Sequence, residues 1–187
     1  FDILEIAAGP LPEYTDDELS ELRKCAKDND IRLTVGYGPA PENNIASADE
    51  KVRAHALEFY KDLFQRMEKI GANLIGGAIY SCWPIDYSKP VDKKGDWQRG
   101  VEGMAKLGQI GRDYGIETIG MEVLNRFENH VLNTAKEGRA FVESVHELEP
   151  KAVNVKVMLD TFHMNIEEQS IGNAIRTAGD LLGHFHT

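Results

Sequence analysis

The chain contains little cysteine and no cysteine pattern. Only Cys25 and Cys82 occur among its 187 residues, and they form neither a C-x-x-C pair nor the even framework of a small secreted domain. A disulfide-dense scaffold is therefore excluded. Both residues are most simply reduced thiols, so we expect a cytoplasmic protein.

Basic residues are also scarce. The chain has 21 Lys and Arg against 31 Asp and Glu, which gives a formal net charge of −10. This charge repels phosphate backbones and anionic lipid surfaces, and no local basic patch compensates for it. No apolar stretch approaches the roughly 20 residues of a membrane span. We therefore expect no nucleic-acid partner and no membrane partner, and a small neutral substrate or a cation instead.

No turn matches the G-x-G-x-x-G pattern or a P-loop, but strand and helix patterns alternate along the whole chain. The six predicted strands span residues 1–8, 31–38, 73–81, 117–125, 152–160 and 181–187. The first of them has the composition of a strand buried on both faces. The five predicted helices begin near residues 15, 47, 97, 134 and 171.

Local signals mark several of these helix ends. Capping-box spacing predicts helix starts at Thr15 with Glu18, Ser47 with Glu50, and Thr134 with Glu137. Gly71 is expected to end the second helix in a left-handed conformation. Repeated strand, crossover helix and parallel strand units give either an open doubly wound sheet or a closed (β/α)8 barrel.

The barrel is favoured by three polar residues that end successive apolar runs: Glu122, Asp160 and His186. In a barrel every strand's carboxyl end faces one mouth, so ligands from three strands can meet on one ion. A complete barrel typically needs about 250 residues and eight strands. We therefore predict an incomplete α/β TIM barrel of about six strands, with residues 1–187 as a single partial domain that lacks the first and last strands.

Two carboxylates and an imidazole are ligands that suit a divalent ion such as Mn, Co, Mg or Zn. Each assignment has a structural alternative. Glu122 could form a buried ion pair, and Asp160 could cap the turn that follows it. His184 and His186 lie on the same face of their strand, so their spacing does not decide which of them is the ligand.

Four segments also resemble the D-tagatose 3-epimerase and D-psicose (D-allulose) 3-epimerase family: YSCWPIDYSKPVDKKGD (80–96), MEVLNRFENHVLNT (121–134), VKVMLDTFHMNIEE (155–168) and GHFHT (183–187). The resemblance covers essentially the whole chain. It implies a xylose-isomerase-like barrel and an isomerase that interconverts free ketohexoses at C3 through a cis-enediolate. It further implies a dimer or tetramer for the full-length parent.

Carried over by position, the resemblance implies that Glu122, Asp160 and His186 hold Mn or Co, with Mg also possible, and that Glu122 doubles as a catalytic acid/base. Glu128 and His163 would bind the sugar's oxygens, and Trp83 would form a wall of the pocket. The family has a fourth ligand, a glutamate on the last barrel strand, and an arginine past the GHFHT segment. Since this sequence contains neither, we expect the isolated chain to lack full activity.

Epimerisation at C3 of a ketose requires the same residue types, namely acid/base carboxylates and ligands for a cation. Inversion at C3 of a ketose needs removal of a weakly acidic proton beside the carbonyl and its return on the opposite face, with the developing charge stabilised. Two alternatives stay open. One is another enzyme of the same barrel superfamily, such as an aldose–ketose isomerase or an endonuclease IV-like hydrolase. The other is a non-catalytic fragment that binds a cation without turnover.

Overall fold

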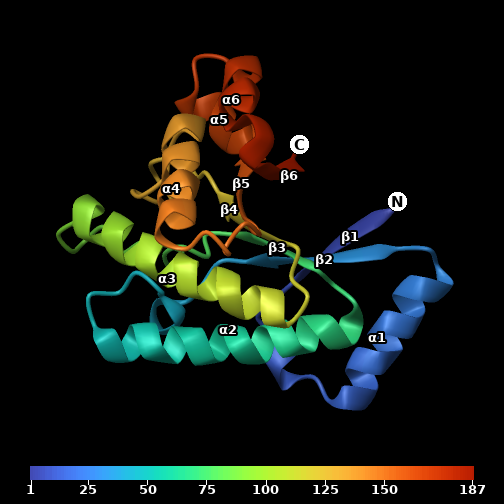
Figure 1. Cartoon of the computed structure of the whole chain (residues 1–187). Coiled ribbons are helices and arrows are strands. Elements are labelled where there is room, and N and C mark those ends of the chain that lie inside the picture. The colour runs from blue at the N-terminus through green and yellow to red at the C-terminus, as the bar shows by residue number, and fades with distance from the viewer.

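The computed structural model describes residues 1–187 and contains one six-stranded parallel sheet (Figure 1). The strands are β1 (Ile3–Ala7), β2 (Arg32–Tyr37), β3 (Leu74–Gly77), β4 (Thr118–Glu122), β5 (Val155–Asp160) and β6 (Leu182–His186). Their order in the sheet is their order in the chain. A doubly wound sheet reverses its strand order at a switch point, whereas a barrel wall does not. The sheet is therefore part of a barrel wall, as predicted.

Six α-helices connect and cover the strands: α1 (Asp16–Asp28), α2 (Glu50–Ile70), α3 (Lys93–Asp113), α4 (Ala135–Leu148), α5 (Thr161–Glu167) and α6 (Ile171–Ala178). Three short 3-10 turns, η1 (Leu11–Glu13), η2 (Pro41–Asn43) and η3 (Gly179–Leu181), complete the chain. Helix α1 contacts α2, α2 contacts α3, α3 contacts α4, and α4 contacts α6. None of the helices has both the length and the apolar character needed to cross a bilayer.

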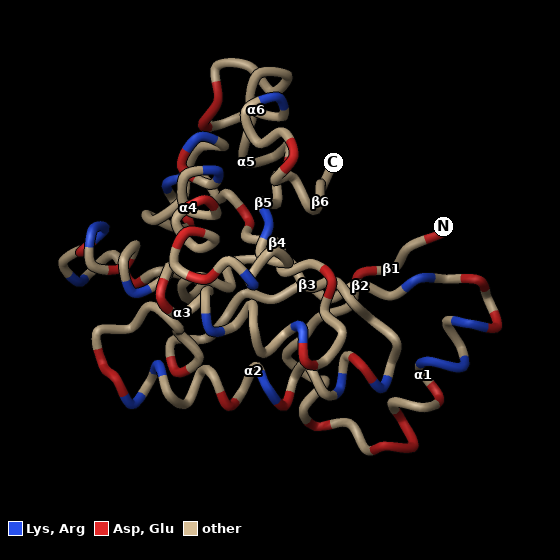
Figure 2. The backbone as a smooth tube through the Cα atoms, in the orientation of Figure 1, with Lys and Arg blue, Asp and Glu red and all other residues tan.

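The two faces of the sheet differ in chemistry. Val35, Ile75, Ile119 and Val157 alternate toward the helices and are fully buried. Burial of each such side chain contributes on the order of 1.5–3 kcal/mol. The charged residues lie mostly along the outer turns of the helices (Figure 2). The core therefore lies between the sheet and its helices, and the other face is left for polar groups.

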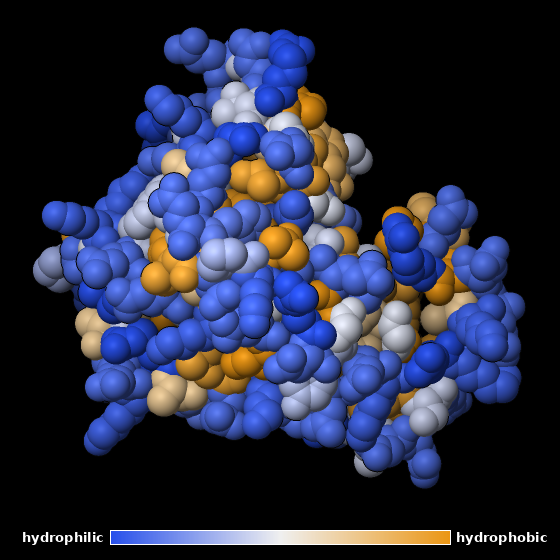
Figure 3. Space-filling view, in the orientation of Figure 1, coloured by the Kyte–Doolittle hydropathy of each residue, from blue (hydrophilic) through white to orange (hydrophobic).

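The inner face of the sheet is kept open by small residues. Gly36, Gly76 and Gly120 lie side by side in register on β2, β3 and β4. A Cβ atom on Gly76 would lie only 2.5 Å from the sulfur of Met158, and one on Gly120 would contact the Met158 Cβ atom, so the Met158 side chain occupies the space that Gly76 and Gly120 leave. The molecule is hollowed between the part that carries the C-terminus and the part that carries the N-terminus (Figure 3).

Several predicted boundaries are confirmed. Thr15 and Glu18 form a reciprocal capping box at the start of α1, and Thr134 and Glu137 form another before α4. Gly71 ends α2 with φ of 78°, a left-handed conformation that glycine adopts without a steric penalty.

Other predictions of local structure are wrong. Ser47 does not cap α2, because the Asp49 side chain is closer to the helix and accepts from the Lys51 N–H, while Ser47 accepts from the Asp49 N–H. Strand β3 ends at Gly77, whose φ of 128° turns the chain away from the sheet. The predicted strand 73–81 is therefore too long.

Strand β1 and helix α5 also differ from expectation. Leu4 is 52% exposed, because β1 is the first strand of the sheet and pairs with β2 alone. The expectation of burial on both faces is thus wrong for β1. Helix α5 was not predicted. It begins directly after β5, where the Asp160 side chain accepts a hydrogen bond from the Phe162 N–H and so caps the helix.

Candidate active site

Two carboxylates and a histidine meet at the carboxyl ends of the central strands. Glu122 is the last residue of β4, Asp160 is the last residue of β5, and His163 lies in the first turn of α5. Each offers a ligand atom, and these atoms all lie within 4.8 Å of one another. The Nε2 atom of His163 is 3.5 Å from Oε1 of Glu122. The fold therefore brings Glu122 and Asp160 together, as the sequence predicts, but with His163 as their third neighbour.

His186, the predicted third ligand, joins the group through Asp160. It ends β6 directly beside Asp160 in the sheet register, and its Nδ1 atom lies 3.5 Å from Asp160 Oδ2. Its other ring nitrogen, Nε2, lies 3.2 Å from Oε2 of Glu5. Glu5, His184 and His186 form a second group with ligand atoms within 4.8 Å.

The two oxygens of Asp160 face different partners. Its Oδ1 accepts the Phe162 N–H at 2.6 Å and caps α5, while Oδ2 faces His186. The capping role considered for Asp160 from the sequence is therefore present, and it leaves Oδ2 free of that contact.

The orientation of His163 is set by Asn125, which follows β4. The Asn125 backbone N–H and side-chain Nδ2 both point at His163 Nδ1, at 3.3 and 2.9 Å. The Asn125 Oδ1 accepts the Phe127 N–H, so Nδ2 is the atom that faces the ring. A backbone N–H only donates, so Nδ1 carries the lone pair and Nε2 carries the hydrogen. His163 thus donates toward Glu122 and has no lone pair to offer there.

The electrostatics of His163, which is buried, differ from those of His184, which is partly buried. Burial lowers the pKa of His163, but the hydrogen bond and charge of Glu122, together with Glu128 and Asp160, outweigh it and leave the pKa raised. Burial and the neighbouring His186 ring lower the pKa of His184. His184 contacts Glu5 at 3.8 Å, and its ring lies edge-on to that of His186.

Glu128 and Trp83 complete the wall of the site. The Trp83 Nε1–H donates to Glu128 Oε2 at 3.0 Å, and the Asn125 side-chain amide donates to Glu128 Oε1 at 2.8 Å. Glu128 is therefore held in place rather than free in solvent, the alternative reading of a lone loop carboxylate. A cavity of about 220 Å³ is lined by Trp83, Glu122, Glu128, His163 and Met158 among others. This volume suits a small polar molecule better than a drug-sized ligand.

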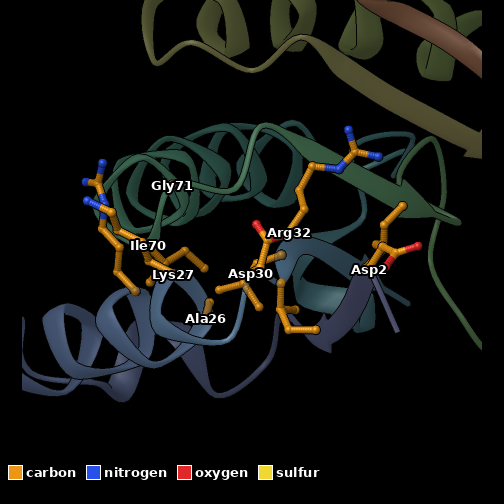
Figure 4. A pocket seen from close by; sticks show the side chains of 11 residues that line it. Asp2, Ala26, Lys27, Asp30, Arg32, Ile70 and Gly71 are labelled. Atoms are coloured by element: carbon orange, nitrogen blue, oxygen red, sulfur yellow. The ribbon is translucent and has the colours of Figure 1, made fainter.

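A larger hollow, of about 650 Å³, lies at the opposite end of the strands (Figure 4). Its side chains, which include Asp2, Lys27, Asp30 and Arg32, spread along a trough between α1 and β2 and do not converge on a point. Catalytic groups in barrels gather at the carboxyl ends of the strands. The smaller cavity is therefore the better candidate site.

Glu5 is the site neighbour that the sequence analysis did not identify. The signal was present, because Glu5 interrupts the apolar run ILEIA of β1 just as Glu122 interrupts its own strand. Position alone did not show that β1 would face β6.

Comparisons with known proteins place the chain in a family. The family model described as "Xylose isomerase-like TIM barrel" matches residues 1–187. The chain belongs to this family. The incomplete barrel and the resemblance to ketose 3-epimerases, both inferred from the sequence, are confirmed.

Several curated relatives are named D-psicose 3-epimerase. The protein from Ruminiclostridium cellulolyticum H10 is 56% identical over 187 residues, covering 100% of this chain and 62% of the relative. The protein from Agrobacterium fabrum C58 is 57% identical over 187 residues, covering 100% of this chain and 63% of the relative. A crystal structure of D-psicose 3-epimerase with D-tagatose from Clostridium cellulolyticum H10 matches with a TM-score of 0.95 and 56% identity, over 100% of this chain and 63% of that chain. The chain thus spans less than two thirds of the length of these relatives.

Proposed function

We propose that this chain carries the metal and substrate groups of a ketose 3-epimerase that acts on free ketohexoses. The observation that carries the proposal is the meeting of Glu122, Asp160 and His163 beside a cavity of about 220 Å³, in a chain whose relatives are named D-psicose 3-epimerase. D-Fructose and D-psicose are the substrate pair we propose first, and D-tagatose and D-sorbose form a second pair.

The donor set fits a divalent cation, for which we propose Mn or Co, with Mg as a further possibility. Glu122 and Asp160 offer carboxylate oxygens, and His186 Nδ1 faces Asp160 Oδ2. When bound, the ion would polarise the ketose carbonyl and stabilise negative charge on the sugar oxygens. His163 is the poorer ligand, since its Nε2 carries a hydrogen.

Other side chains of this chain transfer the proton and bind the substrate. Glu122 moves the C3 proton, and the His163 Nε2–H that points at Glu122 Oε1 orients that carboxylate. Glu128 is held by hydrogen bonds from Trp83 and Asn125. It accepts a hydrogen bond from a sugar hydroxyl and so helps to orient the substrate. Trp83 closes the wall of the cavity.

Return of the proton on the opposite face needs a second acid/base group. The relatives are longer than this chain, and we propose that their additional length supplies it. We also propose that the full-length protein is a dimer or tetramer.

A turnover assay on two forms tests the proposal. Each form, this chain and the chain extended to the length of its relatives, is titrated with Mn²⁺ or Co²⁺ and supplied with D-fructose, and the products are separated by chromatography. Metal-dependent formation of D-psicose by the extended form supports the proposal. Interconversion of aldose and ketose instead, or cleavage of DNA at abasic sites, would replace it with another activity of the superfamily.

A further inference from the structure

We propose that Glu5 is a positioning residue that fixes the ring orientation and tautomer of His186 as a metal ligand. This inference rests on the proposed function, because it assigns His186 Nδ1 to the ion. Glu5 and His186 are 181 residues apart in sequence and lie on the two outer strands of the sheet. The curvature of the sheet brings β1 and β6 toward each other across the open side of the wall (Figure 1).

The contact determines which nitrogen of His186 carries the hydrogen. His186 Nε2 lies 3.2 Å from Glu5 Oε2, and an ionised carboxylate only accepts hydrogen bonds. The hydrogen of the neutral ring therefore sits on Nε2, and Nδ1 keeps its lone pair. A carboxylate bound to the second nitrogen of a metal-ligating histidine is a common way to orient the ring.

The other side of the His186 ring shows what the lone pair faces. Nδ1 lies 3.5 Å from Asp160 Oδ2, so two acceptors point at each other. Such a pair is unfavourable unless a positive centre lies between or beside them. A divalent ion at the carboxyl ends of β4 and β5 satisfies both.

Gly36 on β2 leaves the space that the Glu5 carboxylate occupies. A Cβ atom at position 36 would lie 2.6 Å from Glu5 Oε1, so the absence of a side chain there leaves room for the carboxylate. Within 4.0 Å, Glu5 has no lysine or arginine partner, and its basic neighbours are His184 and His186. The carboxylate, 32% exposed, is therefore directed at the histidine pair and not neutralised by a surface cation.

Mn²⁺ binding to the full 187-residue chain, followed by the electron paramagnetic resonance signal of the free ion, tests the inference without any turnover. Glu5→Ala is expected to weaken binding roughly 10- to 100-fold, the usual effect of removing a partner of a ligating histidine. Gly36→Ala keeps the charge but displaces the carboxylate, and it should weaken binding in the same direction. Glu21→Ala, an exposed change of the same charge on α1, is the matched control and should bind Mn²⁺ as the unmodified chain does.

The ring ¹⁵N shifts of His186 in the metal-free chain provide a readout that a merely structural role would not move. We expect the hydrogen on Nε2 in the unmodified chain, and a shift toward Nδ1 in Glu5→Ala. If Glu5→Ala binds Mn²⁺ as tightly as the unmodified chain, or if His186 carries its hydrogen on Nδ1 with Glu5 present, the inference is wrong while the proposed function stands. If the unmodified chain binds no Mn²⁺, the metal site of the proposed function fails first, and the role of Glu5 fails with it.

Discussion

The contact between Arg126 and Glu167 ties the loop after β4 to helix α5, and its removal should destabilise the chain. Glu167 accepts the Arg126 backbone N–H at 2.6 Å and two guanidinium nitrogens, Nε at 2.9 Å and Nη2 at 2.6 Å. The Glu167 side chain is only 4% exposed, whereas that of Arg126 is 65% exposed. The Arg126 side chain thus covers the Glu167 carboxylate and shields it from solvent.

The magnitude follows from this geometry. Hydrogen bonds to charged groups contribute about 1.5–3 kcal/mol each before solvent screening, and the exposure of Arg126 reduces that value. We expect Glu167→Gln to lower the free energy of unfolding by about 2 kcal/mol, because the amide keeps one acceptor but loses the charge and the paired geometry. Asp62→Asn is the matched control. It breaks an exposed i,i+4 pair with Arg66 and should lower the free energy by only about 0.3–0.5 kcal/mol.

The effect should depend on pH in a direction that the structure sets. The hydrogen bonds and charge of Arg126 hold the pKa of Glu167 below its ordinary value. A group with a depressed pKa in the folded state contributes stability above its unfolded pKa, near 4.3, and loses it as the pH falls through the folded pKa. Urea unfolding at a series of pH values should therefore show the two proteins differing at pH 7 and converging in acid. An equal free energy of unfolding at pH 7, or a gap that persists below the folded pKa, would refute the reasoning.

Three further predictions concern the site, and a fourth concerns the end of helix α2. His186→Ala should weaken Mn²⁺ binding at least 10-fold while His163→Ala weakens it less, as measured by calorimetric titration, and the reverse order would make His163 the ligand. In the extended form, Glu128→Gln should raise KM for D-fructose several-fold with little loss of Mn²⁺ affinity, and an unchanged KM would remove Glu128 from the substrate contacts. Trp83→Phe removes the Nε1–H that holds Glu128 and should give a smaller rise in KM, which a steady-state assay would detect. Gly71→Ala places a side chain at φ of 78° and should lower the free energy of unfolding by about 1 kcal/mol in thermal melts, a loss that Gly9→Ala at an ordinary φ should not reproduce.

Much of the fold was predictable because local and long-range signals agree. Capping boxes at Thr15 and Thr134 and the glycine at position 71 fix helix ends through backbone hydrogen bonds within a few residues. The alternation of strand and helix predicted a parallel sheet, and the polar residues that end three successive apolar runs favoured a barrel over an open sheet. Helix α5 could not be predicted in the same way, because it has only seven residues and its cap is Asp160, the residue that ends β5.

The candidate site was less predictable than the fold. Glu122 and Asp160 could be identified because a carboxylate at the end of an apolar strand is unusual, and parallel strands end at a common edge. Glu5 lies in the middle of β1 and not at its end, and its contact with His186 depends on how far the sheet curves, which no local pattern encodes. The position of His163 between Asn125 and Glu122 likewise arises from a loop and a helix that meet only in the folded chain.

The two histidines nearest the carboxylates show why residue type is not enough to assign a ligand. His163 receives hydrogen bonds on Nδ1 from Asn125, so its Nε2 becomes a donor toward Glu122. His186 gives its Nε2–H to Glu5, so its Nδ1 becomes an acceptor toward Asp160. The neighbours thus impose the same tautomer, with the hydrogen on Nε2, on both rings, but they turn a different nitrogen of each ring toward the carboxylates at the strand ends. In the proposed function, the Nδ1 lone pair of His186 would bind the cation, and the Nε2–H of His163 would orient Glu122 by a hydrogen bond.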